Sequence, residues 1–257
     1  MNVAPNTSTR KRIVAGPVLF TLAMVCALQA IGGEKLSIST GANLMSKYVW
    51  RGQLVNDEPV LQPAITFSYG DFSFGTWASM DLTDIAGSNE RYHIQEVDYT
   101  LSYATSVTEN MDLEVGGIVY AFPSAPDTAE LYSGLTYSTP LVTPSITVYY
   151  DVEEAEGFYA SIGVDRSFDL TEKVSLNVGA SQGWGDSSYD NYYFGVNDAG
   201  LNDLSLHSAL SYSPNETTTF SASVQYTSFV DSDISNVADA GGDAENVIVG
   251  VGGEWSF

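Results

Sequence analysis

Cysteine is almost missing from this sequence: the 257 residues contain one, Cys26. It lies in an N-terminal segment where three basic residues at positions 10–12 precede an apolar, uncharged stretch from Ile13 to Leu28. Small residues follow, which is the pattern of a secretory signal peptide. We therefore expect residues 1–32 to be cleaved, leaving residues 33–257 as one domain without a cysteine or a disulfide.

Two further absences narrow the class of protein. After residue 32 no apolar run approaches the ~18 residues that a membrane-spanning helix needs, so any passage through a membrane must use strands. Basic residues are scarce as well, because nine Lys and Arg stand against 32 Asp and Glu, a net charge of −23. Removal of the leader, with three of the bases, lowers this charge to near −26. Such a surface repels phosphates, which argues against nucleic-acid binding.

What the sequence does contain is a regular alternation of apolar and polar residues. In the last stretch, Val247, Val249, Val251, Trp255 and Phe257 share one face. Alternation of this kind indicates strands whose two faces meet different environments. Twelve such strands are predicted, at residues 36–50, 60–69, 72–81, 93–104, 111–121, 129–137, 145–152, 157–167, 173–182, 204–212, 217–228 and 246–257.

The charged residues test this assignment. The outward faces are defined by apolar side chains alone, yet the charged residues identified on the strands all fall on the opposite parity. A Lys or Arg on the lipid face near mid-bilayer costs roughly 2–4 kcal/mol, so this exclusion is typical of a membrane barrel. A soluble β-sandwich, with its apolar face inward, would show it as well. The residues expected to line the lumen are Lys47, Arg51, Glu96, Asp98, Asp112, Glu114, Glu130, Asp151 and Asp165.

The connections between the strands alternate short and long, as in barrels with short periplasmic turns and longer outer loops. An even number of strands places both termini at one rim, which we expect to be periplasmic. Aromatic residues at strand ends suit the two membrane interfaces, although Tyr is also a good strand former. The strand-end aromatics are Tyr48, Trp50, Tyr69, Tyr103, Tyr120, Tyr137, Tyr149, Tyr150, Tyr212, Tyr226 and Trp255.

Three motifs stand out in the first half of the chain. Ser46 to Gly52 reads Ser-Lys-Tyr-Val-Trp-Arg-Gly, Phe74 to Ser79 reads Phe-Gly-Thr-Trp-Ala-Ser, and Glu96-Val97-Asp98 precedes an aromatic strand end. In these motifs the chain resembles the TorF-like porin family of Gram-negative outer-membrane β-barrels, best over residues 36–105. The resemblance implies a β-barrel and carries over no catalytic set. The terminal Phe257 also resembles the aromatic end that outer-membrane assembly machinery recognises.

These observations predict an all-β fold, a single antiparallel transmembrane β-barrel of about twelve strands in the bacterial outer membrane. The expected function is passive diffusion of small polar or cationic solutes, because inward acids concentrate cations. The expected partners are outer-membrane lipid and lipopolysaccharide, the assembly machinery through the strand ending at Phe257, and small solutes. No cofactor and no metal are expected.

Three alternatives stay open. A closed structural or ligand-binding barrel with acidic loops is one, because twelve strands enclose less space than the 16–18 strands of large porins. An outer-membrane hydrolase using His93 or His207 is another, but no nucleophile–base spacing is recognisable, and the chain is not expected to be an enzyme. The third is a secreted soluble β-protein with its apolar face turned inward.

Overall fold

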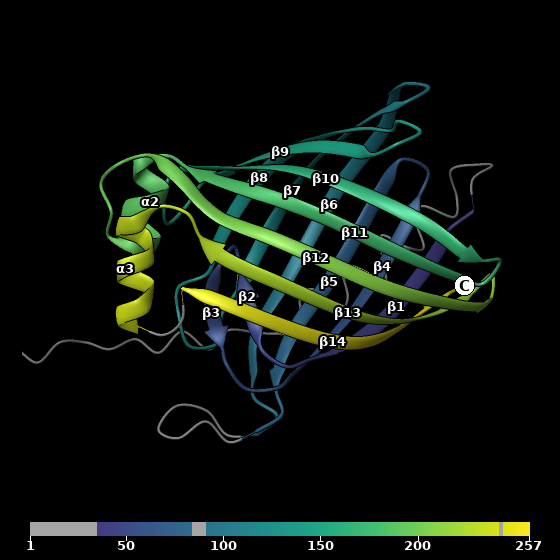
Figure 1. The fold of residues 1–257 in the computed structure, drawn as a ribbon, viewed down its shortest axis with the longest axis horizontal. Helices are drawn as coiled ribbons and strands as arrows, with labels where there is room; N and C mark the ends of the chain where they lie inside the picture. Colours follow the sequence, from purple (N-terminus) through teal and green to yellow (C-terminus); the bar gives the residue numbers. More distant parts are fainter. Residues whose placement is uncertain (1–34, 84–90, 242–243) are drawn as a thin grey trace, which may run out of the picture. The chain divides into compact units, whose positions relative to one another are not determined.

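Twelve antiparallel strands close into a barrel in the computed structural model, which describes residues 35–83, 91–241 and 244–257 (Figure 1). The predicted fold class is thereby confirmed. The expected signal peptide, residues 1–32, lies outside the described residues. The barrel strands are β1 (Ser37–Met45), β4 (Val60–Tyr69), β5 (Phe72–Asp81), β6 (Ile94–Thr108), β7 (Met111–Ala121), β8 (Thr128–Tyr137), β9 (Thr143–Asp151), β10 (Phe158–Thr171), β11 (Val174–Gly185), β12 (Gly200–Asn215), β13 (Thr218–Phe229) and β14 (Glu245–Ser256).

The barrel is closed by its first and last strands. β1 pairs with β4 from Ser37 to Met45 and with β14 from Ser39 to Met45, both antiparallel. Every wall strand of the described chain therefore has two neighbours, and no strand of the wall is left as an open edge. We call the rim that holds Ser37 and Phe257 the terminus end, and the opposite rim the loop end.

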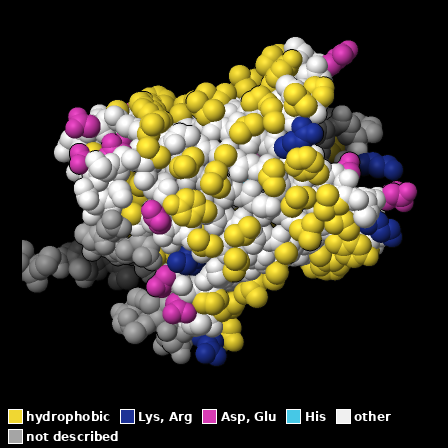
Figure 2. Space-filling view, viewed as in Figure 1, with side chains coloured by type: hydrophobic (Ala, Val, Ile, Leu, Met, Phe, Trp, Pro, Cys, Tyr) yellow, Lys and Arg dark blue, Asp and Glu magenta, His cyan; other side chains and the backbone are white. Residues whose placement is uncertain are grey.

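The outer surface of the wall is apolar. Phe72 on β5, Leu131 on β8, Ile162 on β10 and Val247 on β14 are each more than half exposed. Figure 2 shows apolar side chains spread across the strands in view, with charged side chains mainly toward the two rims. A soluble protein rarely exposes an apolar band of this extent, whereas a lipid-facing wall requires one.

Two charges of the described strands lie on the outward parity: Glu245, the exposed first residue of β14, and Arg166. Arg166 on β10 shares the outward face of its strand with Val164 and Phe168. Its guanidinium carbon lies 4.8 Å from the centre of the Phe168 ring, and it donates a hydrogen bond to the carbonyl of Leu141 in the turn at the terminus end. The position at the rim lets this side chain reach water, so the charge avoids mid-wall depth.

The predicted first strand, 36–50, is wrong beyond residue 45. β1 ends at Met45, where it pairs with Val60, and the chain between them forms a separate hairpin of β2 (Tyr48–Trp50) and β3 (Gln53–Asn56). Alternation of residues shows that a segment is extended, but it does not show which sheet the segment joins. Tyr48 and Trp50, predicted as strand-end aromatics at a membrane interface, belong to this hairpin.

Two helices occupy loops that were predicted without secondary structure. α2 (Ser187–Phe194) and α3 (Ser232–Gly241) both lie at the loop end, where Figure 1 shows them together. Neither their length nor their composition fits a bilayer: the described residues hold no helix that could cross a membrane. α2 begins after Asp186, which caps it by accepting a hydrogen bond from the Tyr189 amide, and ends at Gly195 in the left-handed region.

Candidate functional site

The β2–β3 hairpin, which we call the lumen hairpin, turns into the barrel interior. Its tip is the two-residue loop between Trp50 and Gln53, which pair with each other. Both tip residues have positive φ, 46° for Arg51 and 82° for Gly52, as a two-residue turn of type I′ requires. A side chain other than glycine costs roughly 1–2 kcal/mol in this region, so other contacts must hold Arg51 in place.

The first of these contacts is an ion pair with Glu130 on β8. Two guanidinium nitrogens of Arg51 donate to the two carboxylate oxygens of Glu130, at 2.8 and 2.7 Å. The side chains are 10% and 1% exposed, so both charges have left water. The Tyr120 hydroxyl donates a further hydrogen bond of 2.8 Å to Glu130. A buried pair is tolerable only when geometry and extra hydrogen bonds offset desolvation, and both conditions are met here.

Four aromatic rings surround the same guanidinium. The distance from the Arg51 guanidinium carbon to the ring centre is 4.6 Å for Trp50, 4.3 Å for Tyr149, 4.2 Å for Tyr159 and 5.8 Å for Tyr189. Rings within about 6 Å of a cation attract it through their electron-rich faces, most strongly where water is excluded. We call Glu130 and these four aromatic side chains the arginine cage.

Apart from Trp50, which belongs to the hairpin itself, the cage draws its members from three wall strands and from a loop helix. Glu130, Tyr149 and Tyr159 come from the neighbouring strands β8, β9 and β10, whereas Tyr189 comes from α2. Tyr189 is 1% exposed because α2 lays its buried residues against the barrel mouth. The loop between β11 and β12 therefore covers the site that the hairpin tip enters.

Helix α2 also carries a buried carboxylate, that of Asp190. Asp190 accepts a hydrogen bond of 2.8 Å from the amide of Asn202, and its second carboxylate oxygen is buried without a partner. Loss of water around this carboxylate raises the pKa of Asp190 to about 6, and the nearby Asp186 adds to the effect.

Tyrosine hydroxyls contact several interior acids at the loop end, and Asp151 also accepts hydrogen bonds of 3.0 and 2.9 Å from the Thr128 hydroxyl. Tyr48 donates to Glu96 at 2.9 Å, Tyr159 donates to Asp203 at 2.8 Å, and Tyr193 lies 3.4 Å from Asp151. All three carboxylates are buried. Phenols supply hydrogen bonds without adding positive charge, so the loop end keeps its acids while packing them densely.

The two ends of the interior differ in solvent access. At the loop end Glu96, Glu130 and Asp151 are buried, whereas inward residues nearer the terminus end, such as Glu114 and Glu254, are exposed. Side chains of the lumen hairpin and α2 account for this difference, because they contact the loop-end acids directly. Among the described residues, the interior acids are therefore buried at the loop end and exposed to water nearer the terminus end.

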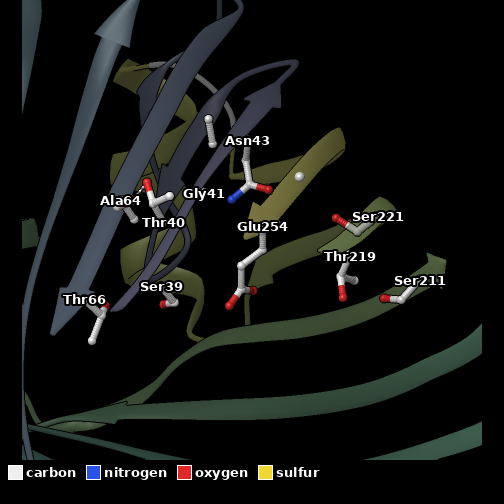
Figure 3. Close-up of a pocket in the computed structure, with 12 residues that line it drawn as sticks. Ser39, Thr40, Gly41, Asn43, Ala64, Thr66, Ser211, Thr219, Ser221 and Glu254 are labelled. Carbon is white, nitrogen blue, oxygen red and sulfur yellow. Dashed lines mark hydrogen bonds between the residues drawn. The ribbon is translucent and has the colours of Figure 1, made fainter. Parts of the chain in front are cut away.

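Cavities occupy the open part. A first, of about 440 Å³, is shown in Figure 3, where polar side chains such as Asn43, Thr219 and Glu254 line a shared space near the terminus end. A second, of about 330 Å³, contains Asp112, Glu114 and Tyr149, among others. A third, of about 220 Å³, lies against Arg51 and shares Tyr149 with the second. The third cavity thus brings space lined by Asp203 and serine hydroxyls into contact with the cage residue Arg51.

The structure brings some of the predicted lumen residues together and separates others. Arg51 and Glu130 meet in the cage, with Glu96 and Asp151 buried at the same end. The remaining residues lie apart from the cage. Lys47 donates a hydrogen bond of 3.2 Å to Asn246, and Asp98 is half-buried beside Glu96. Asp112 and Glu114 line the second cavity, and Asp165 lies 2.9 Å from the ring nitrogen Nε2 of His207.

Sequence reasoning missed the aromatic part of the site. Tyr120 and Tyr149 were predicted to belong to interface girdles, as were Tyr48 and Trp50, but all four lie inside the barrel. The alternation of residues could have placed Tyr120 and Tyr149 inside the barrel, because both fall on the inward side of their strands. The neighbouring Tyr150 falls on the outward side. The contribution of Tyr189 had no signal in the sequence, since it depends on how α2 folds over the mouth.

Comparison with known proteins agrees with this architecture. The family model described as MltA-interacting protein MipA matches residues 38–257. Three solved structures share the fold at low identity: the KdgM porin (11% identity, TM-score 0.53, 86% of this chain and 99% of that one), the NanC porin (10%, 0.52, 86% and 99%) and the COG4313 outer membrane channel from Pseudomonas putida F1 (8%, 0.51, 88% and 96%). No curated protein matches the sequence.

Proposed function

The chain belongs to the MltA-interacting protein MipA family, and from this premise we propose that it is an outer-membrane barrel closed at its loop end by the lumen hairpin. The resemblance to TorF-like porins pointed to the same kind of barrel through a different family. The observation that carries the proposal is the seating of Arg51 in the cage, because it joins the hairpin tip to three wall strands and α2.

The proposed membrane location is supported by the apolar wall. Exposed Leu, Ile, Val and Phe side chains follow the outward parity on strands around the ring, and inward positions carry most charges. The longer connections lie at the loop end and include α2 and α3. We place the terminus end in the periplasm, because outer-membrane barrels have their short turns on that side.

In this arrangement the barrel is a gated channel in its closed state. Small polar or cationic solutes enter the open cavities from the terminus end, where Asp112 and Glu114 favour cations. Passage across the membrane requires the lumen hairpin to leave the cage. Rings of acidic side chains select cations in other channels by the same electrostatic attraction.

A second candidate is a closed barrel that binds a protein partner. The family is named for an interaction with MltA, and a permanently sealed lumen would suit a protein whose work is binding rather than transport. In this account the lumen hairpin is a structural brace, and the partner contacts the periplasmic rim or the loops.

Liposome measurements test the proposal and separate the two candidates. Purified protein should float with vesicles, and wild-type vesicles should resist swelling by small cations. Vesicles carrying a variant with a displaced hairpin should swell. Protein that stays in solution without detergent would contradict the membrane location, and vesicles that remain impermeable with either form would favour the binding barrel.

A further inference from the structure

We propose that the arginine cage is a binding site for free guanidinium-bearing cations, and that Arg51 is a tethered occupant which such a ligand displaces. The inference rests on the proposed closed barrel and gives its gate a ligand. Displacement of Arg51 would release the lumen hairpin from β8, so the ligand that enters the cage would also favour the open state.

The shape of the cage fits a guanidinium group in particular. Glu130 accepts two parallel hydrogen bonds from the planar fork of Arg51, a geometry that an ammonium ion cannot reproduce. Tyr149 and Tyr159 lie at the two shortest ring distances, 4.3 and 4.2 Å from the guanidinium carbon. A cation of another shape would gain the aromatic contacts but lose one of the two hydrogen bonds.

The tethered occupant is held under backbone strain, which makes exchange possible. Arg51 has a φ of 46°, where most side chains are disfavoured. A free ligand gives the contacts with Glu130, Tyr149, Tyr159 and Tyr189 without this strain, although Trp50 leaves with the hairpin. The hairpin recovers backbone freedom when it leaves. The cage therefore binds its own chain less tightly than the contacts alone would suggest.

The cavity that touches Arg51 shares a lining residue with the cavity that holds two exposed acids. The cavity of about 220 Å³ is lined by Arg51, Tyr149 and Tyr159, together with Asp203 and several serines. Tyr149 also lines the cavity of about 330 Å³, where Asp112 and Glu114 are exposed. A cation attracted by these acids would reach the underside of the cage without passing the packed loop end.

The lining also restricts the ligand. Among the described residues that line the cavity below the cage, Arg51 is the one positive side chain, while Asp203 is acidic. Once Arg51 has left the cage, a ligand carboxylate would find no cationic partner among these lining residues and would meet the acidic Asp203. The proposed ligand class is therefore a guanidinium cation without a carboxylate, such as a decarboxylated arginine, rather than the amino acid.

Emptying the cage tests the proposal. Arg51→Gly keeps the turn, because glycine adopts positive φ freely, and removes the tethered occupant. Binding of agmatine to the detergent-solubilised protein is measured by calorimetry. We expect the variant to bind agmatine at least about tenfold more tightly than wild type, which must first expel Arg51. L-arginine and tetramethylammonium should bind the variant at least about tenfold more weakly than agmatine does.

A matched second variant ties binding to the cage. Glu130→Gln added to Arg51→Gly should abolish the preference for agmatine over tetramethylammonium. A neutral amide cannot accept two parallel hydrogen bonds from a guanidinium group as a charged carboxylate does. Arg51→Asn, which also tolerates positive φ, provides an independent empty cage. Folding of each form is checked by its β-sheet circular dichroism.

The proposal is overturned if folded Arg51→Gly and Arg51→Asn proteins bind agmatine no better than wild type, or if L-arginine binds equally well. These outcomes do not depend on membrane transport. Failure of the closed-barrel proposal would appear instead in the liposome permeability of the wild-type protein, so the two can fail separately.

Discussion

Arg51 and Glu130 are 79 residues apart in the sequence and meet inside the barrel through two hydrogen bonds of 2.8 and 2.7 Å. One residue belongs to a hairpin tip and the other to a wall strand. Their contact therefore converts a local turn into a brace across the interior.

Replacing Glu130 with Gln should destabilise the folded barrel strongly. The guanidinium of Arg51 would stay buried without a counter-charge, and removal of one partner from a buried ion pair costs about 3–5 kcal/mol. The free energy of unfolding in urea, measured in detergent micelles, checks this expectation. A loss below about 1 kcal/mol, the range of exposed pairs, would show that Arg51 is not held as described.

A double variant separates the pair from the rest of the packing. Arg51→Gly combined with Glu130→Gln should lose less stability than the sum of the two single changes, because neither charge is then left alone. Additive losses would contradict direct coupling between the two side chains.

Replacing Gly52 with Ala should expel the hairpin tip from its seat. Gly52 has a φ of 82°, and an added Cβ would come within 2.8 Å of both the Cβ of Asp203 and the ring of Phe229. Trypsin cuts after arginine, so the bond after Arg51 should resist cleavage in wild type and become cleavable in this variant.

Gly195 offers the matched control for this experiment. It has a similar φ of 70°, but nothing lies within 4 Å of the position that a Cβ would take there. Gly195→Ala should therefore carry the backbone strain alone, with a cost of about 1 kcal/mol, and leave the bond after Arg51 protected. Equal cleavage in both variants would mean that strain rather than the clash releases the hairpin.

The raised pKa of Asp190 predicts a pH dependence of stability. The pKa is about 6 in the folded protein, above about 3.9 for an unfolded chain, so the folded state binds the proton more tightly. This stabilisation is fully present below about pH 4 and is lost as the pH rises through about 6. Its size is at most about 3 kcal/mol.

Asp190→Asn isolates this contribution, because the amide cannot titrate. The difference in unfolding free energy between wild type and variant should change between about pH 4 and pH 6 and stay constant above about pH 7. Parallel profiles over the whole range would rule out a buried, proton-binding Asp190.

Asp112 and Glu114 should set the charge preference of an opened lumen. Both are exposed on the inward side of β7 and line the same cavity. In a protein whose hairpin has been shortened, Asp112→Asn with Glu114→Gln should lower the cation-to-anion permeability ratio, because fewer acids attract cations. The reversal potential in a salt gradient measures this ratio.

Glu216 supplies the control for that experiment, since it is exposed in the β12–β13 turn at the terminus end. Glu216→Gln removes a charge from the rim without changing the cavity lining. If it shifts the reversal potential as much as the Asp112 and Glu114 changes do, the preference arises from overall charge rather than from the lumen.

The wall of the barrel could be predicted from the sequence because every strand separates two environments. Val247, Val249 and Val251 alternate with more polar or smaller residues and mark the apolar face of β14. The register of β14 against β13 keeps these three residues on one face. The lumen hairpin could not be found in this way. Tyr48 and Trp50 continue the alternation of β1, although they leave its sheet. Tyr48 is buried against Glu96, which is distant in the sequence, and Trp50 packs against Arg51 in the hairpin turn.

The sequence placed the charged residues of the site inside the barrel, but it did not reveal which aromatic residues surround them. Arg51 and Glu130 could be assigned to the interior by parity, but their pairing needed the three-dimensional position of the hairpin. α2 has no apolar stripe that would mark it as a helix in the sequence Ser-Ser-Tyr-Asp-Asn-Tyr-Tyr-Phe. Its cap at Asp186 and the burial of Tyr189 and Phe194 stabilise it.

Single-channel recording tests the closure of the lumen most directly. Wild type is compared in planar bilayers with a variant in which residues 47–57 are replaced by a short Gly-Ser linker, which leaves the pairing of Met45 with Val60 in place. The wild-type protein should show no steady conductance, and the variant should show a steady, cation-selective one. A wild-type protein that conducts as steadily as the variant would contradict closure by the hairpin.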